Sequence, residues 1–156
     1  MTADEVQKLV NTAFANVARP DVFTSGCTCD ECAALNRKLR KSDTELPDGL
    51  AWELPLLSPS AVRYLTPKLL ENSLSDTGDE DLGWNFVEML GGPISSTNPP
   101  DSLPFSCEFN QQQCVAVLEF FQFIREHWYE DHEEIPREVN RGIRNWQHFA
   151  EQAAKR

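Results

Sequence analysis

The chain has 156 residues, of which 40% are hydrophobic and 25% are charged, and it carries a formal net charge of −11. This length suits a single domain with a core of its own. With a sequence pI near 4.6, the acidic balance excludes nucleic acid and anionic membrane from the expected partners, because both select basic surfaces.

The N-terminal stretch predicts an amphipathic helix. Thr2 and Glu5 have the spacing of a capping box, and apolar residues then recur at helical spacing until Arg19 and Pro20. The stretch lacks a basic start followed by an apolar run, so we expect no secretory signal. No apolar run approaches membrane-spanning length, and an odd number of cysteines fits a reducing compartment. We therefore expect a cytoplasmic protein.

A second helix is predicted from Thr28 to about Lys41. Thr28 and Glu31 again have capping-box spacing. The stretch is acidic at its start and basic at its end, an order that complements the helix dipole. The basic residues at the end of this stretch are therefore explained by the helix dipole, and no nucleic-acid partner is needed to account for them.

Three cysteines at the start of this helix form the first candidate site. Cys29 and Cys32 have the spacing of a zinc knuckle, and Cys27 is a candidate third ligand. A structural zinc needs four ligands, and the remaining one would come from Cys107, Cys114 or a histidine. Two alternatives stay open: the thiols are inert core residues, or they form a redox pair at a helix start.

Prolines punctuate the most apolar stretch of the chain, residues 52–74. Ser58 precedes Pro59 and Thr66 precedes Pro67, and a hydroxyl residue before a proline is typical of a helix start. We expect two short helices in series, or one helix kinked at Pro67. The apolar residues expected to form the middle of the core are Trp52, Leu54, Leu57, Val62, Leu65, Leu69, Leu70 and Leu74.

Arg63 and Tyr64 interrupt this apolar run and form a candidate binding pair. A buried arginine needs a partner, so one interpretation pairs Arg63 with a carboxylate beside a half-buried Tyr64. The other interpretation makes Arg63 an anion-binding residue.

The central motif resembles that of a protein family. Trp-x-Leu-Pro begins at Trp52, and Leu-Ser-Pro-x-x-x-Arg-Tyr-Leu-x-Pro-x-x-Leu follows at Leu57–Leu70. Together they resemble the core motif of a family of small bacterial proteins. Members often carry an upstream Cys-x-x-Cys, here Cys29–Cys32, and a downstream Gln-rich helix start, here 110–121. This chain departs from the family at Val62, where an aromatic residue tends to stand. The similarity covers about two thirds of the chain and implies kinship and a bacterial origin, but the family has no assigned activity to carry over.

The segment 75–81 is acidic and supplies further candidate binding residues. Its carboxylates do not stand in the register of an EF-hand, so a solvated loop is favoured over a calcium site. An acidic edge of this kind would suit a basic protein partner. The candidate residues are Asp76, Asp79, Glu80 and Asp81.

The C-terminal half predicts three further helices. The first covers 82–90, and the segment 94–104 that follows is a binding edge or a linker. Asn110 and Gln113 form a capping box for a helix that is apolar on more than one side. Pro136 opens the last helix, in which Gly142 costs about 1 kcal/mol relative to alanine.

A polar cluster near the end of the 110–128 helix is the second candidate for a metal or for acid–base chemistry. The sequence carries no zinc-protease, hydrolase, P-loop or dinucleotide motif, and His148 is expected on a helix surface. The members of the cluster are His127, Glu130, Asp131, His132 and Glu134.

We therefore expect a mostly α, single compact domain of about five or six helices with long loops over residues 1–156. The expected function is a non-enzymatic acidic module that binds another protein, for example an immunity-type protein that masks a basic toxin. The alternative is a zinc-stabilised module built on Cys27, Cys29 and Cys32. An enzyme would require a pocket that gathers Arg63, Tyr64 and the histidines. Monomer and homodimer both remain open.

Overall fold

The computed structural model describes residues 1–42, 45–92, 100, 103–128 and 135–156, and this part of the chain is built from helices. The predicted mostly α fold is confirmed. The described residues form seven α-helices, one more than the upper prediction, because α3 is a single turn too short to show a periodic pattern. The elements are α1 (Ala3–Phe14), α2 (Asp30–Lys41), α3 (Leu50–Glu53), η1 (Leu54–Leu56), α4 (Pro59–Leu74), α5 (Glu80–Gly91), η2 (Ser106–Glu108), α6 (Gln111–His127) and α7 (Arg137–Ala153).

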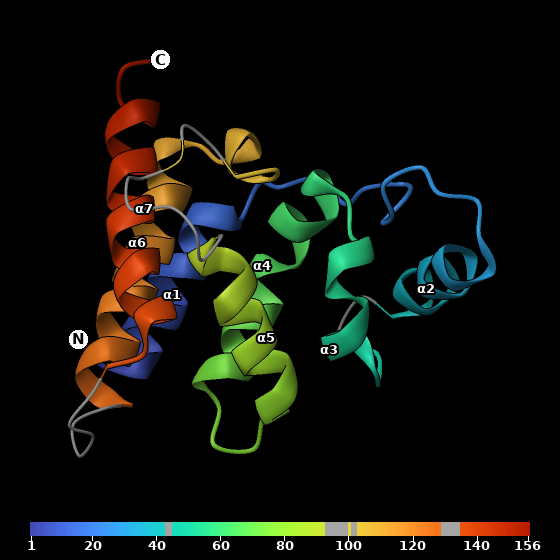
Figure 1. Cartoon of the computed structure of the whole chain (residues 1–156), viewed down its shortest axis with the longest axis horizontal. Helices are drawn as coiled ribbons and strands as arrows, with labels where there is room; N and C mark the ends of the chain where they lie inside the picture. Colours follow the sequence, from blue (N-terminus) through green and yellow to red (C-terminus); the bar gives the residue numbers. More distant parts are fainter. Residues whose placement is uncertain (43–44, 93–99, 101–102, 129–134) are drawn as a thin grey trace.

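The described helices are arranged in three groups along the long axis of the molecule. Figure 1 shows α1, α6 and α7 side by side at one end, α4 and α5 in the middle, and α2 at the opposite end. The single β pairing in the described ranges is an isolated bridge between Thr24 and Leu57. Within those ranges no helix combines the length and the apolar character needed to cross a membrane. Most of the predicted 94–104 segment lies outside the described residues.

Capping boxes begin two of the helices, as predicted. Thr2 and Glu5 exchange hydrogen bonds at the start of α1, and Asn110 and Gln113 do so at the start of α6. Each box satisfies two backbone N–H groups that a helix start leaves without intrahelical acceptors. Helix α1 ends at Phe14, earlier than the predicted stop at Arg19 and Pro20.

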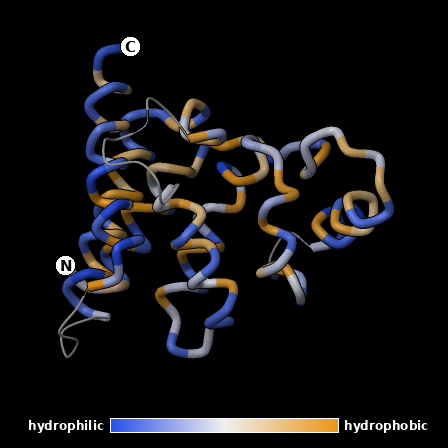
Figure 2. Tube along the Cα trace, in the orientation of Figure 1, coloured by the Kyte–Doolittle hydropathy of each residue, from blue (hydrophilic) through white to orange (hydrophobic). Residues whose placement is uncertain are grey.

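Helix α6 is buried on more than one side, as its wide apolar face predicts. Phe120, Phe121 and Ile124 are each 0% exposed. Phe14 of α1 and Trp146 of α7 meet Phe109 just before α6, with ring centroids 5.4 and 5.3 Å away, respectively. In Figure 2 hydrophobic residues interrupt the hydrophilic trace of α7, as expected of a helix with one buried side.

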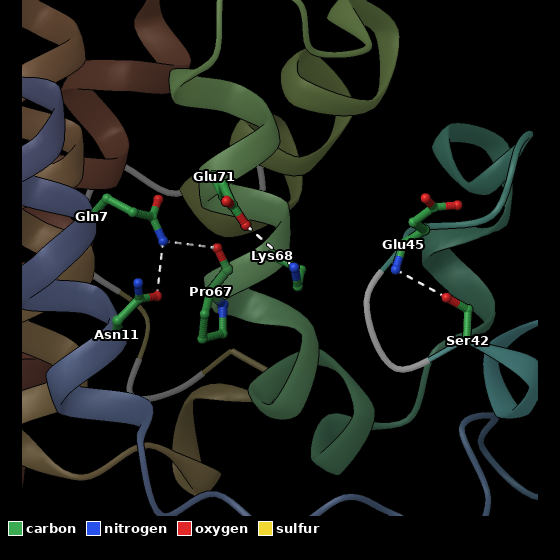
Figure 3. Close-up of polar contacts among 7 residues, drawn as sticks. All are labelled: Gln7, Asn11, Ser42, Glu45, Pro67, Lys68 and Glu71. Carbon is green, nitrogen blue, oxygen red and sulfur yellow. Dashed lines mark hydrogen bonds and ion pairs between the residues drawn. The ribbon is translucent and has the colours of Figure 1, made fainter.

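The proline-punctuated stretch forms one continuous helix, α4, with Pro67 inside it. Because proline has no N–H, the carbonyl four residues earlier receives no intrahelical bond from it. The Thr66 hydroxyl donates to the Val62 carbonyl at 2.7 Å in the same turn. On the side facing α1, Gln7 donates to the Pro67 carbonyl at 3.3 Å and to Asn11 at 2.9 Å, so a side chain joins the two helices at the proline (Figure 3).

The apolar stripe of α4 forms part of the core, but Trp52 does not. Leu54 and Leu57 are buried as predicted, whereas Trp52 is 75% exposed, so its predicted burial is wrong. Helix α3, which the sequence did not predict, covers this position. One helical turn places Leu50 and Leu54 inward, which leaves Trp52 on the outer side. The buried residues of α4 are Ala61, Val62, Leu65, Thr66, Leu69, Leu70 and Ser73.

Two glycines let α7 pack closely against its neighbours. A Cβ at Gly142 would lie 2.2 to 2.5 Å from ring atoms of Phe121, and one at Gly91 would lie 2.9 Å from the Glu138 carbonyl oxygen. Two side chains of α7 then reach the end of α5: Asn145 donates to the Gly91 carbonyl and Trp146 to the Leu90 carbonyl, both at 2.8 Å. These bonds satisfy carbonyls that a helix end leaves without partners.

Gly142→Ala is expected to lower the free energy of unfolding by about 1–3 kcal/mol, because the methyl group must displace the buried Phe121 ring. The gain in helix propensity, about 1 kcal/mol, acts in the opposite direction. Urea denaturation measures the difference, with the exposed Asn140→Ala on the same helix as the control, which should be neutral or slightly stabilising. An increase in stability for Gly142→Ala would contradict the close approach of α6 and α7.

Candidate functional site

The three N-terminal cysteines come together where the loop enters α2. Their Sγ atoms all lie within 4.8 Å of one another. Cys29, and not the predicted Thr28, is the N-cap of the helix: its Sγ accepts the Cys32 N–H at 3.5 Å. The Cys29 N–H in turn contacts the Cys27 Sγ at 3.4 Å. A sulfur atom therefore takes the place of the capping hydroxyl, and this draws the thiols together.

The spacing of the sulfurs is compatible with a bound metal ion. Tetrahedral coordination with Zn–S bonds of about 2.3 Å places ligand sulfurs about 3.8 Å apart, so the cluster needs to contract by no more than about 1 Å. Cys27 and Cys29 are exposed and Cys32 is buried, so an ion can enter from solvent. The three cysteines could hold a metal.

The described residues supply three ligands to this group rather than four. Cys107 and Cys114, the predicted candidates for a fourth, are not part of it. Cys107 lies in η2, and Cys114 lies in the first turn of α6. A three-cysteine set leaves one coordination position for water or another ligand. All five cysteines are free thiols in this structure.

The thiols of Cys29 and Cys32 differ in acidity. The hydrogen bond from the Cys32 backbone N–H, followed by bonds from the neighbouring thiols, lowers the pKa of Cys29. Burial, with the adjacent Cys29 and Cys27 as further causes, raises the pKa of Cys32 to about 12. Cys29 is thus the thiol prepared to ionise, while a metal ion would have to displace the proton of Cys32.

Helix α2 is held in place by the loop that precedes it. The Asn36 side chain accepts the Phe23 N–H and donates to the Thr24 hydroxyl, both at 2.8 Å. On another side Lys38 forms an ion pair with Glu53 at 2.9 Å. The polar contacts fix the helix relative to α3 and the Thr24–Leu57 bridge, and the cysteine cluster lies at its free N-terminal end.

Arg63 and Tyr64 take part in packing between helices. The Arg63 Nε donates to the Gln113 side-chain oxygen at 3.0 Å, so its partner is an amide and not the predicted carboxylate. Gln113 can serve because its capping role already turns its oxygen toward α4 and the start of α6. Tyr64 is half-buried, as predicted, and packs edge-on against Phe23 with ring centroids 6.1 Å apart. The hollow that Tyr64 lines is bordered by no histidine among the described residues.

The acidic residues after α4 mostly serve the start of α5. Asp79 is its N-cap and accepts the Leu82 N–H at 3.0 Å, and Glu80 and Asp81 follow in the first turn. Carboxylates at this end complement the helix dipole, so α5 begins before the predicted residue 82. Asp76 lies in the preceding loop. A hollow of about 260 Å³ is bordered by Asp76, Asp79 and Glu80 together with Trp84 and Trp128.

Of the polar cluster predicted near the end of the 110–128 helix, the structure describes only the first residue, His127. His127 stacks on Phe123 with ring centroids 4.1 Å apart, and its Nδ1 lies 3.0 Å from the Phe123 carbonyl oxygen. The remaining predicted members, 130–132 and 134, lie outside the described residues. His148, predicted on a helix surface, is partly buried on α7 beside Phe149.

A cavity that the sequence did not predict lies between α3, α5 and α7. Its volume is about 720 Å³, and Arg141 and Trp52 contribute to its walls. Arg141 is only 8% exposed. The signal available in the sequence was the spacing of Arg141 and Asn145, which lie one turn apart beside the apolar stripe of α7.

Comparison with known proteins returned no matching family model, no matching curated protein and no matching solved structure. The resemblance carried by the Leu57–Leu70 motif therefore stays a prediction.

The cysteines should differ in their rates of alkylation. With iodoacetamide at pH 7.5, we expect Cys29 to be modified well before Cys32 and Cys114, because its pKa is lowered while burial raises the pKa of Cys32 to about 12 and that of Cys114 to about 11. Peptide mass spectrometry against time measures the order, and Cys114, buried far from the cluster in sequence, serves as the internal control. Equal rates for Cys29 and Cys32 in the folded protein would contradict this geometry.

Proposed function

We propose that the chain is a non-enzymatic metal-binding module in which Cys27, Cys29 and Cys32 hold a zinc ion. The observation that carries the proposal is the approach of their three Sγ atoms to within 4.8 Å at the start of α2. Thiolates suit zinc among the common protein metals. Reduced thiols are needed for this chemistry, which fits the expected cytoplasmic setting.

The proposed role of the ion is structural. Cys27 belongs to the loop and Cys32 to the first turn of α2, so a shared metal would join the loop to the helix. α2 lies at the end of the molecule away from the α1–α6–α7 group (Figure 1). Binding to the folded form alone would stabilise it by mass action. The fourth coordination position would be left to water.

Reduced, untagged protein should bind about one zinc ion per chain, measured by elemental analysis after removal of free metal. Chelation should lower the melting temperature, and cobalt substitution should give the charge-transfer absorption of a thiolate-ligated ion. Cys29→Ser should lose most of the bound metal, whereas the matched variant Cys107→Ser, an exposed cysteine outside the cluster, should retain it. Clearly substoichiometric zinc together with unchanged melting after chelation would refute the proposal.

The second candidate function is binding of a basic protein, for example a toxin masked by an immunity-type partner. The observation that favours it is the hollow of about 260 Å³, where carboxylates of the 76–80 segment border the same space as Trp84 and Trp128. Acidic groups next to aromatic faces suit a lysine or arginine side chain, which gains both ion pairing and a cation–π contact. The net charge of −11 supports attraction of a basic partner over a distance.

A stoichiometric partner should co-purify from the native host at moderate salt, and a variant with Asp76→Asn and Glu80→Gln should bind it at least about tenfold more weakly. Affinity of the purified pair is measured by titration calorimetry at two salt concentrations. The double variant Asp4→Asn and Glu151→Gln, which changes two exposed residues that do not border the hollow, is the charge-matched control and should bind normally. Failure to recover any partner under several growth conditions would argue against this function, and unchanged affinity in the double variant would exclude the hollow as its site.

A further inference from the structure

The cavity between α3, α5 and α7 has the features of a ligand site distinct from the cysteine cluster. It measures about 720 Å³, within the range of small-molecule pockets. Three separate elements supply its walls: α3 with η1, α5 and α7. Close packing of α7 through Gly91 and Gly142 holds one wall in place.

Arg141 is the cation among the residues that border this cavity, and no described residue pairs with it. The residue is only 8% exposed, and its Nε is buried without a hydrogen-bond partner. No ion pair or hydrogen bond to Arg141 occurs among the described residues. Buried guanidinium groups are normally paired, and the fork of N–H donors matches a carboxylate in bidentate fashion. The arrangement therefore provides a place for a carboxylate brought by a ligand.

Two glutamates on the same cavity argue against a simple anion. Glu88 of α5 and Glu138 of α7 also border it, so a ligand with negative charge alone would meet two like charges. A ligand that carries an ammonium group as well as a carboxylate meets a complementary group at each end. Asn85, also on the wall, already donates through its Nδ2 to the Ala51 carbonyl at 3.0 Å, which leaves its oxygen free to accept a bond from an ammonium group.

The remaining wall is apolar and includes an aromatic ring that the core does not use. Leu54, Pro55 and Met89 border the cavity, and Trp52 adds its ring while remaining 75% exposed. A tryptophan so exposed beside a pocket gains contact area when an apolar group covers it. The wall therefore suits the hydrophobic side chain of the ligand.

We propose that this cavity binds a small apolar zwitterion, either a free α-amino acid with an aromatic side chain or a short peptide ending in one. Arg141 holds the carboxylate, Glu88 and Glu138 hold the ammonium group, and Trp52 packs against the side chain. The cavity is larger than one amino acid, so both the free amino acid and a dipeptide fit its dimensions.

Titration calorimetry with L-phenylalanine and with the dipeptide glycyl-L-phenylalanine tests the proposal on the full chain. At least one of the two should bind, and the comparison identifies the source of the zwitterion. N-Acetyl-L-phenylalanine, which lacks the ammonium group, and phenethylamine, which lacks the carboxylate, should each bind at least about tenfold more weakly. Binding should also protect tryptophan fluorescence from acrylamide quenching, because Trp52 is the most exposed large hydrophobic residue in the described chain.

Substitutions test which residue binds which group of the ligand. Arg141→Met should abolish binding. Trp52→Ala and Glu88→Gln change exposed residues and should fold normally while weakening binding at least about tenfold. Glu126→Gln, an exposed glutamate on α6 that does not border the cavity, is the matched control and should bind as the unmodified chain does. No binding of either zwitterion, equal binding of the analogues that lack one charge, or unchanged binding in Trp52→Ala and Glu88→Gln would each overturn the proposal.

Discussion

The close packing of α7 against α6 is the contact on which much of this structure depends. Position 142 has room for a hydrogen atom and not for a methyl group, because the Phe121 ring occupies the space. Once α7 lies this close, Asn145 and Trp146 reach the last carbonyls of α5. The short distance between α6 and α7 therefore determines both the packing of the aromatic core and the hydrogen bonds at the end of α5. Because the interior is densely packed, neither can change without the other.

The same close packing of α7 places a charged residue in the interior. Arg141 precedes Gly142, so the close approach of α7 carries it to the wall of the cavity with α3 and α5. The cysteine cluster, by contrast, depends on the local chemistry of a helix start, where Cys29 caps α2. The two candidate sites therefore rest on different physical grounds: one on tertiary packing and the other on a few adjacent residues.

This difference explains how much could be predicted from the sequence. Capping boxes at Thr2 and Asn110 are local patterns, and they located the starts of α1 and α6 correctly. The approach of the three cysteines was also local and was one of the alternatives that the sequence offered, although the cap itself was assigned to Thr28. Trp52 was misjudged because a single turn has no period to detect. Arg141 was missed because its burial follows from the packing of three distant segments.

Gln113 joins three helices through one amide. Its oxygen accepts from the Asn110 N–H and the Arg63 Nε, and its nitrogen donates to the Ala13 carbonyl. A carboxylate of the same shape could keep the first two bonds but would set a negative oxygen against the carbonyl. The residue type at position 113 is therefore restricted by three hydrogen-bond partners. In related sequences, we expect positions 63 and 113 to change together rather than singly.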